Sequence, residues 1–180
     1  MTLLSWARLA TVAVVALIVQ VAVLDQVVVL GAHPDLMIVL VGAAGAVGSP
    51  SRGAMIGFVL GLVADLVLPT PYGLSSLTFV LIGFTAGLVH TLPGDREGRS
   101  VQCVTSIAAA AAGTLLYAVI GALVGQSGFL GRNLADALLV VTAGAIVMAF
   151  PAVAAMHWTL KDADRAASGH AIPAGGSALN

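Results

Sequence analysis

Apolar residues fill this chain in six long runs, which are separated only by short stretches of proline, glycine, serine and charged residues. Hydrophobic residues make up 59% of the 180 positions and charged residues only 8%, so too little polar surface exists to cover a water-soluble globule. Because a backbone inside a bilayer must satisfy its own hydrogen bonds, runs of this length predict membrane-spanning helices. The sequence therefore predicts an integral membrane protein of the all-α class.

Helix-breaking residues set the limits of the predicted spans. Proline and glycine interrupt the apolar runs near residues 33–34, 49–53, 69–73, 93–98 and 128–131. We expect a six-helix transmembrane bundle with spans at about 9–30, 34–48, 53–68, 74–92, 101–125 and 134–160, followed by a disordered cytoplasmic tail at 161–180. The second and third spans are short, about 24 Å against a hydrocarbon core of about 30 Å, which favours a hairpin held inside the bundle.

The basic residues predict the orientation. With six spans and a cytoplasmic N-terminus, six of the seven Lys and Arg residues lie on the cytoplasmic side and only Arg132 lies outside. The net charge of −1 provides no basic surface for nucleic acid, and the single cysteine, Cys103, excludes an internal disulfide and a thiolate metal site. We therefore expect both termini in the cytoplasm and the lipid bilayer as the main surroundings.

Asp65 is the most unusual charged residue, because it lies late in an apolar span. The end of a helix disfavours an anion, and a charged side chain at the bilayer centre costs on the order of 2.5 to 3.5 kcal/mol. After the next turn, Gly73, Ser75 and Ser76 offer N–H groups and hydroxyls as partners. Two interpretations stay open: a structural clasp across the hairpin, and direct contact with a partner or ligand.

Asp35 has a simpler interpretation, because it follows Pro34 at the start of a span, where an acidic residue suits the first helical turn. Asp136 lies early in the sixth span and favours the same interpretation. The residues that we retain as candidate partner or ligand contacts are Pro34, Asp35, Asp65, Pro71, Tyr72, Gly73 and Ser75.

Glycines recur at intervals of four residues along several spans, which lets helix backbones approach closely. In the third span this series runs directly into Asp65. Packing within one chain is favoured over a dimer interface, since the pattern is common in apolar helices. The predicted helix-packing residues are Gly53, Gly57, Gly61, Gly83, Gly87, Gly121 and Gly125.

No pattern of catalytic residues is found. The serines near Gly73 lie at the outer side of the predicted bundle, whereas His90 and His157 lie near its inner side, across a core of about 30 Å. There is no HExxH, no paired metal ligands and no phosphate-binding loop. The sequence therefore predicts a protein that is not an enzyme, with no cofactor and no metal.

The order of these features resembles one family. Pro34-Asp35-Leu36 opens a short apolar span, a Ser-Pro-Ser-Arg-Gly turn follows, and then comes GAMIGFVLGLVADLVLPTPYGLSSLTFVLIGFTAGLV. This succession, over about residues 33–90, resembles the rod shape-determining membrane protein MreD family. On that resemblance, Asp65, Pro71 and Gly73 match the outer hairpin of the family, and Pro34 and Asp35 match the start of its second span.

The resemblance implies a non-catalytic, six-span protein of the bacterial inner membrane that scaffolds the cell-wall elongation (rod) complex. The implied partners are MreC, which has one membrane span and an extracytoplasmic domain, and the peptidoglycan synthases, a SEDS glycosyltransferase and a penicillin-binding protein. The implied role is the maintenance of rod cell shape.

A second interpretation comes from the same fold. The family's bundle is similar to the substrate-binding S-components of energy-coupling-factor vitamin transporters, which need an outward pocket and a small-residue face on the first span. Here Ala7, Ala10, Ala13 and Ala16 are three residues apart and drift around the helix. Few aromatic residues accompany the outer polar ones. The scaffold interpretation is therefore favoured over vitamin binding.

Overall fold

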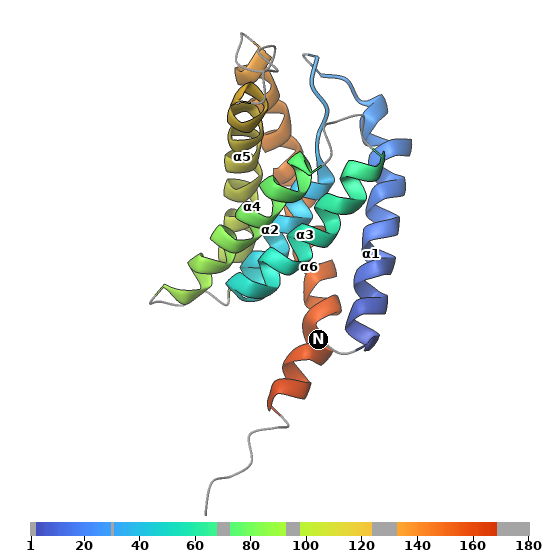
Figure 1. Ribbon diagram of the computed structural model, residues 1–180, viewed down its shortest axis with the longest axis vertical. Helices are drawn as coiled ribbons and strands as arrows, with labels where there is room; N and C mark the ends of the chain where they lie inside the picture. Colours follow the sequence, from blue (N-terminus) through green and yellow to red (C-terminus); the bar gives the residue numbers. More distant parts are fainter. Residues whose placement is uncertain (1–2, 30, 68–72, 93–97, 124–132, 169–180) are drawn as a thin grey trace, which may run out of the picture.

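A computed structural model describes residues 3–29, 31–67, 73–92, 98–123 and 133–168. Within these ranges the chain forms six α-helices and no β-strand (Figure 1). The elements are α1 (Leu3–Ala22), the 3-10 turn η1 (Leu24–Gln26), α2 (Leu36–Val47), α3 (Pro50–Val67), α4 (Leu74–Thr91), α5 (Arg99–Leu123) and α6 (Asn133–Ser168). The predicted all-α bundle is confirmed.

Four segments of the described chain are long and apolar enough to cross a membrane: Leu3–Gln26, Pro50–Val67, Arg99–Leu123 and Leu134–Leu160. Two shorter apolar helices, Leu36–Val47 and Leu74–Val89, complete the set. Together with the high hydropathy of the chain, these helices establish a transmembrane protein.

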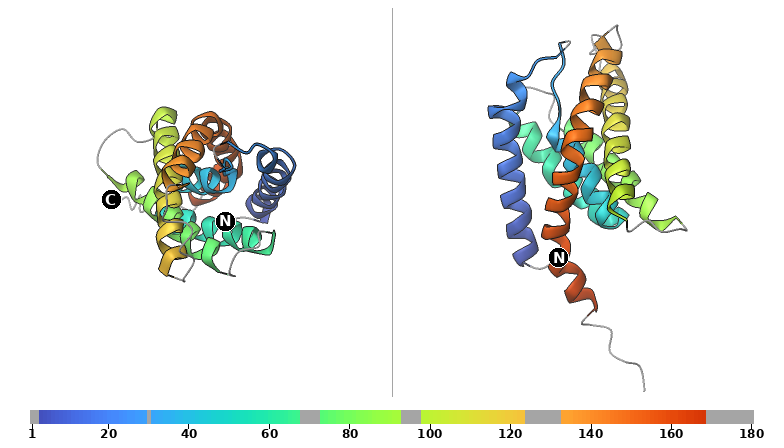
Figure 2. Two further views of the ribbon diagram at one scale, coloured as in Figure 1. Left: turned by 90° about the horizontal axis from the view of Figure 1, so that it is seen from above. Right: turned by 180° about the vertical axis from the view of Figure 1, so that it is seen from behind.

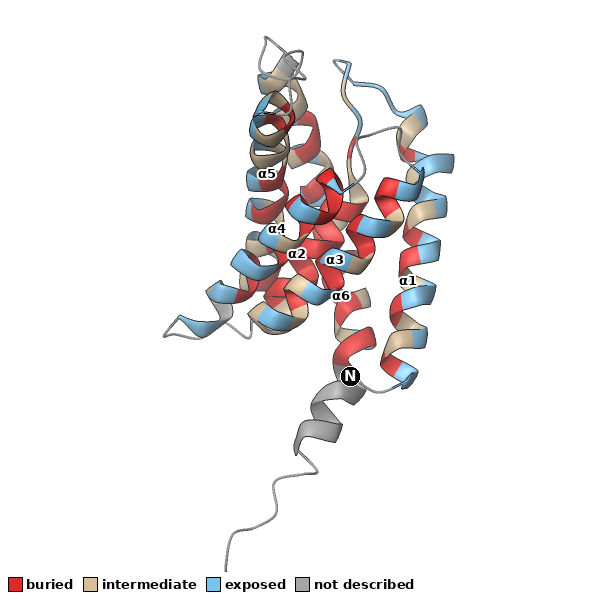
Figure 3. Ribbon diagram, in the orientation of Figure 1, coloured by how far each residue is buried: buried red, intermediate tan, exposed pale blue. Residues whose placement is uncertain are grey.

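The short helix α2 forms the centre of the bundle. Its 12 residues span only about 18 Å, and every residue from 37 to 46 is buried. It contacts all the other α-helices, and the view along the bundle shows it surrounded by them (Figure 2). A helix that is apolar on all sides must be kept away from water, and here the other helices cover it. Colouring by burial places the core along α2 and the helix faces turned toward it (Figure 3).

Two antiparallel pairs pack around α2. The most extensive contact joins α3 to α4, and these two helices run obliquely to α1 and α5 (Figure 1). The next most extensive contact joins α5 to α6. Helix α1 lies at the side, against α6 and α2, and buries only a narrow face through Leu9, Ala13 and Ala16.

The first apolar run is not one continuous helix. α1 ends at Ala22, η1 turns the chain, and a tight turn closed by a bridge between Val29 and Ala32 leads back to α2. At the other end of the chain, α6 continues to Ser168, past residue 160 where the predicted sixth span ends. Of the predicted tail, residues 169–180 lie outside the described residues.

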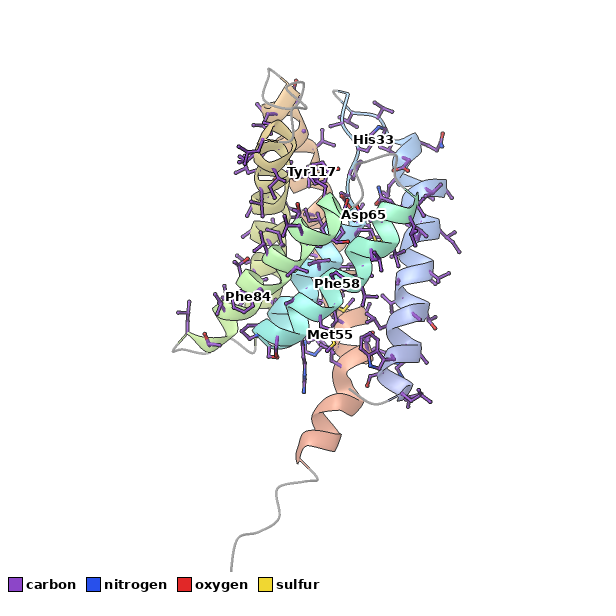
Figure 4. All side chains as sticks on the ribbon, in the orientation of Figure 1. His33, Met55, Phe58, Asp65, Phe84 and Tyr117 are labelled. Carbon is purple, nitrogen blue, oxygen red and sulfur yellow. The ribbon has the colours of Figure 1, made fainter. Side chains whose placement is uncertain are left out.

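The outer faces of α3 and α4 carry large apolar side chains, as expected for surfaces in contact with lipid. Figure 4 labels three of them, Met55 and Phe58 on α3 and Phe84 on α4. The exposed large apolar side chains on this pair are Met55, Phe58, Leu62, Leu66, Val67, Leu77, Leu81, Phe84 and Leu88.

Candidate functional site at the α3–α4 turn

The carboxylate of Asp65 binds the start of the next helix. Its Oδ2 accepts hydrogen bonds from the N–H of Gly73 (3.0 Å) and of Ser76 (3.2 Å), and from the Ser76 hydroxyl (2.9 Å). Its Oδ1 accepts from the N–H of Ser75 (3.1 Å). Asp65 is only 2% exposed, and Figure 4 shows it between α3 and α4. We call this set of four hydrogen bonds the Asp65 clasp.

The clasp explains why an anion is tolerated late in α3. The first N–H groups of a helix have no partner within that helix and form its positive end. The fold brings the start of α4 against the end of α3, so Asp65 satisfies these groups of α4 rather than opposing the dipole of α3 alone. Gly73 makes the approach possible because its φ of 95° is left-handed, a conformation that suits glycine.

The clasp also limits the chemistry of Asp65. An ionised carboxylate has about four acceptor positions, and four donors already point at this one. Among the residues that the structure describes, no three His, Cys, Asp or Glu side chains gather to hold a metal ion. The geometry is that of a structural connection between two helices.

A second polar cluster holds the start of α2. The Asp35 side chain caps this helix, with Oδ1 accepting from the N–H of Met37 (2.9 Å) and of Ile38 (3.2 Å). Gln20 on α1 completes the cap: its Oε1 accepts from the N–H of Leu36 (2.9 Å), while its Nε2 donates to Asp25 and to the carbonyl of Pro34. The sequence analysis did not identify Gln20. The feature that indicates it is a polar amide side chain within an otherwise apolar helix.

The glycines of three helices meet below the clasp. A Cβ atom at Gly53 on α3 would collide with the carbonyl of Gly83 on α4, and one at Gly83 would collide with the carbonyl of Gly53. Gly45 of α2 packs at the same point, because a Cβ atom at Gly53 would lie 2.8 Å from the Cα atom of Gly45. We call Gly45, Gly53 and Gly83 the glycine junction. Gly45 was not among the predicted packing glycines.

The other predicted packing glycines have different surroundings. Gly57 and Gly61 face the α4 backbone at Phe79 and Ser76, and Gly87 faces Pro50. Gly121 is buried on α5, and Gly125 lies outside the described residues.

The predicted contact residues therefore fall into three groups. Asp65, Gly73 and Ser75 come together in the clasp. Pro34 and Asp35 belong to the separate cluster at the start of α2. Pro71 and Tyr72 lie outside the described residues.

Comparison with known proteins gives a match over most of the chain. The family described as rod shape-determining protein MreD matches residues 1–157. No curated protein and no solved structure matches the chain. The resemblance drawn from residues 33–90 is thus confirmed over a longer stretch. The similarity to transporter S-components stays a prediction.

Proposed function

Because the chain belongs to the rod shape-determining MreD family, we propose that it is a non-catalytic membrane scaffold of the complex that elongates the bacterial cell wall. Family membership establishes the coarser role, which is in rod shape determination within a membrane. The scaffold function, its partners and its place in the inner membrane with both termini in the cytoplasm are our proposal.

The Asp65 clasp is the structural observation that supports this proposal most. A reacting or ligand-binding carboxylate needs free acceptor positions, whereas Asp65 uses its oxygens to hold α4 against α3. Such a connection holds the end of α3 against the start of α4. Helix ends that are held together suit a surface against which another protein assembles, since preorganised contacts reduce the entropy lost on binding.

The proposed partners follow from the family. An MreC-like protein with one membrane span is the direct partner, and a SEDS glycosyltransferase and a penicillin-binding protein assemble with it directly or indirectly. The contact surface that we propose for the MreC-like partner is formed by Gly73, at the start of α4, together with Pro71 and Tyr72, which precede it in the sequence and lie outside the described residues.

Affinity purification tests this proposal. The tagged chain is extracted from its native membrane in mild detergent, and the co-purifying proteins are identified by mass spectrometry. Recovery of a single-span protein with a large outer domain, together with wall synthases, is the expected result. Recovery of paired ATPases with a transmembrane coupling subunit would instead support vitamin uptake and contradict the scaffold proposal.

A further inference from the structure

Three consecutive valines follow the first span and are exposed. Val27, Val28 and Val29 come directly after the candidate membrane span Leu3–Gln26, with exposed fractions of 43%, 60% and 46%. They lie in the connection between η1 and α2, which rises beyond the end of α1 (Figure 1). Single exposed apolar residues are common on protein surfaces, whereas a run of three in a loop indicates a contact surface. We call these three residues the valine edge.

The backbone of the valine edge is not helical, and part of it has no partner. Val29 forms a β-bridge with Ala32, in which the N–H of each residue donates to the carbonyl of the other at 3.0 and 2.9 Å. The N–H and C=O of Val28 make no hydrogen bond with a described residue. Lipid-exposed backbone with open hydrogen-bonding groups does not occur in the hydrocarbon core of a bilayer. The valine edge therefore lies outside that core, where lipid tails do not cover its side chains.

Contacts at both ends hold the valine edge in place. Gln20 Nε2 donates to Asp25 Oδ1 (2.9 Å), just before the edge, and to the carbonyl of Pro34 (3.1 Å), just after it. Pro34 also packs against α6, since a Cβ atom at Gly144 would lie 2.7 Å from the Cβ atom of Pro34. One amide side chain thus ties both ends of the connection to α1. A surface that is held in this way loses less entropy when a partner binds.

The chemistry of the valine edge fits an added β-strand. Valine is among the residues that strands prefer. A peptide strand offers the backbone donor and acceptor that Val28 leaves open, together with apolar side chains that cover the valines. Natural proteins protect exposed strand edges with charged residues or proline, and residues 27–32 contain neither. A layer of lipid headgroups offers no apolar cover, and the backbone groups within a helix are already paired. An extended peptide segment meets all these requirements.

Charge narrows the choice of the partner segment. Asp25 and Asp35 flank the valine edge, and each is partly exposed. Arg8, Arg52 and Arg99 lie near helix starts at the opposite end of the bundle. Opposite charges across an interface steer association and help to select the partner. A partner segment with a lysine or arginine beside its apolar residues is therefore favoured.

We propose that the valine edge receives an extended segment of an extracytoplasmic protein domain, which pairs its backbone with Val28 and places a lysine or arginine near Asp25 or Asp35. The proposal rests on the scaffold function and the orientation proposed above. It adds a second contact to the one at the start of α4, and it specifies backbone pairing as the mode of recognition.

The variant Val28→Pro tests the backbone pairing, because proline has no N–H to donate. The Val28 N–H makes no hydrogen bond with a described residue, and Val27 has φ −90° and ψ 84°, outside the helical region that a following proline disfavours. Val28→Ala is the matched control, since it shortens the side chain but keeps the N–H. We expect Val28→Pro to retain about tenfold less of the single-span partner than Val28→Ala in affinity purification. Equal retention by the two variants would overturn the proposal.

Photo-crosslinking in the native membrane identifies the occupant. Benzoylphenylalanine replaces Val28 or, as a control, Val147, which is 75% exposed in the middle of α6. We expect only position 28 to capture the outer domain of another protein, at a peptide that contains a lysine or arginine. The proposal is wrong if position 28 captures no protein, only lipid, a second copy of this chain, or a membrane helix of the partner.

These outcomes separate the strand proposal from the scaffold function. Failure to co-purify a single-span protein would contradict the scaffold function, whereas the cross-link at position 28 decides the strand proposal by itself. Partner retention that is equal in the two variants would leave the scaffold function intact and exclude the valine edge as its contact. If Val28→Pro does not fold, hydrogen exchange of the Val28 amide in the wild-type chain replaces it. Exchange should be slower in the complex, and an unchanged rate would count against the proposal.

Discussion

Asp65 illustrates how a charge is accommodated within an apolar bundle. Considered within α3 alone, the carboxylate lies at the wrong end of a helix. Considered within the hairpin, it lies at the favourable end of α4 and accepts hydrogen bonds from three N–H groups and one hydroxyl. The end of α3 therefore disfavours the negative charge of Asp65, and the hydrogen-bond donors at the start of α4 compensate for it. Removing the carboxylate leaves the N–H groups at the start of α4 without this partner.

We predict that Asp65→Asn destabilises the protein by on the order of 1 to 3 kcal/mol, because an amide nitrogen cannot accept the bonds that Oδ2 accepts. Asp136→Asn is the matched control. Asp136 lies in the first turn of α6, and its carboxylate makes no hydrogen bond with a described residue, so its change should stay within about 0.5 kcal/mol. Thermal unfolding in mild detergent measures both. Similar losses in the two variants would contradict a special role for the clasp.

At the scale of the helices, the glycine junction determines how closely three of them pack. In a membrane, the surrounding lipid is as apolar as the side chains, so close backbone packing replaces the hydrophobic effect as a source of stability. Gly53 and Gly83 each face the other's carbonyl, and Gly45 brings α2 to the same point. The hairpin and the central helix therefore form one packed unit that supports the clasp.

We predict that Gly83→Ala destabilises the bundle by about 1 to 3 kcal/mol, because the added Cβ meets the backbone of Gly53 rather than a movable side chain. Gly98→Ala is the control, since nothing lies within 4 Å of a Cβ at that position. Denaturation in mixed detergent micelles compares the two variants. A stable Gly83→Ala protein would mean that α3 and α4 separate without cost.

Contacts between residues close in the sequence were predictable, whereas contacts between residues far apart in the sequence were not. The partners of Asp65 are 8 to 11 residues away, across a turn marked by proline and glycine, so the sequence indicates them. Gln20 contacts residues 14 and 16 positions away, and it does so because η1 and the turn between Val29 and Ala32 return the chain to α2. Nothing in the apolar run signals that return. Gly45 was missed because α2 is buried on all sides and shows no single small-residue face.

At the scale of the whole molecule, the bundle has one basic end. Arg8, Arg52 and Arg99 lie near the starts of α1, α3 and α5, and these three helices start at the same end of the bundle (Figure 1). The α3–α4 turn lies at the opposite ends of its helices. The positive-inside rule predicts that the basic end faces the cytoplasm and that the α3–α4 connection lies on the outer side, where an extracytoplasmic partner domain would meet it.

Reporter fusions test this orientation. We predict that a fluorescent protein fused after Ser168 is bright and that alkaline phosphatase fused there is inactive, because the C-terminal end of α6 lies at the basic end of the bundle. Alkaline phosphatase inserted between α5 and α6 should be active, since the two ends of a transmembrane helix lie on opposite sides. A fusion of alkaline phosphatase to a chain truncated within α6 controls for expression. Active phosphatase after Ser168 would reverse the orientation, move the α3–α4 turn to the cytoplasm, and exclude that turn as the contact for an extracytoplasmic domain.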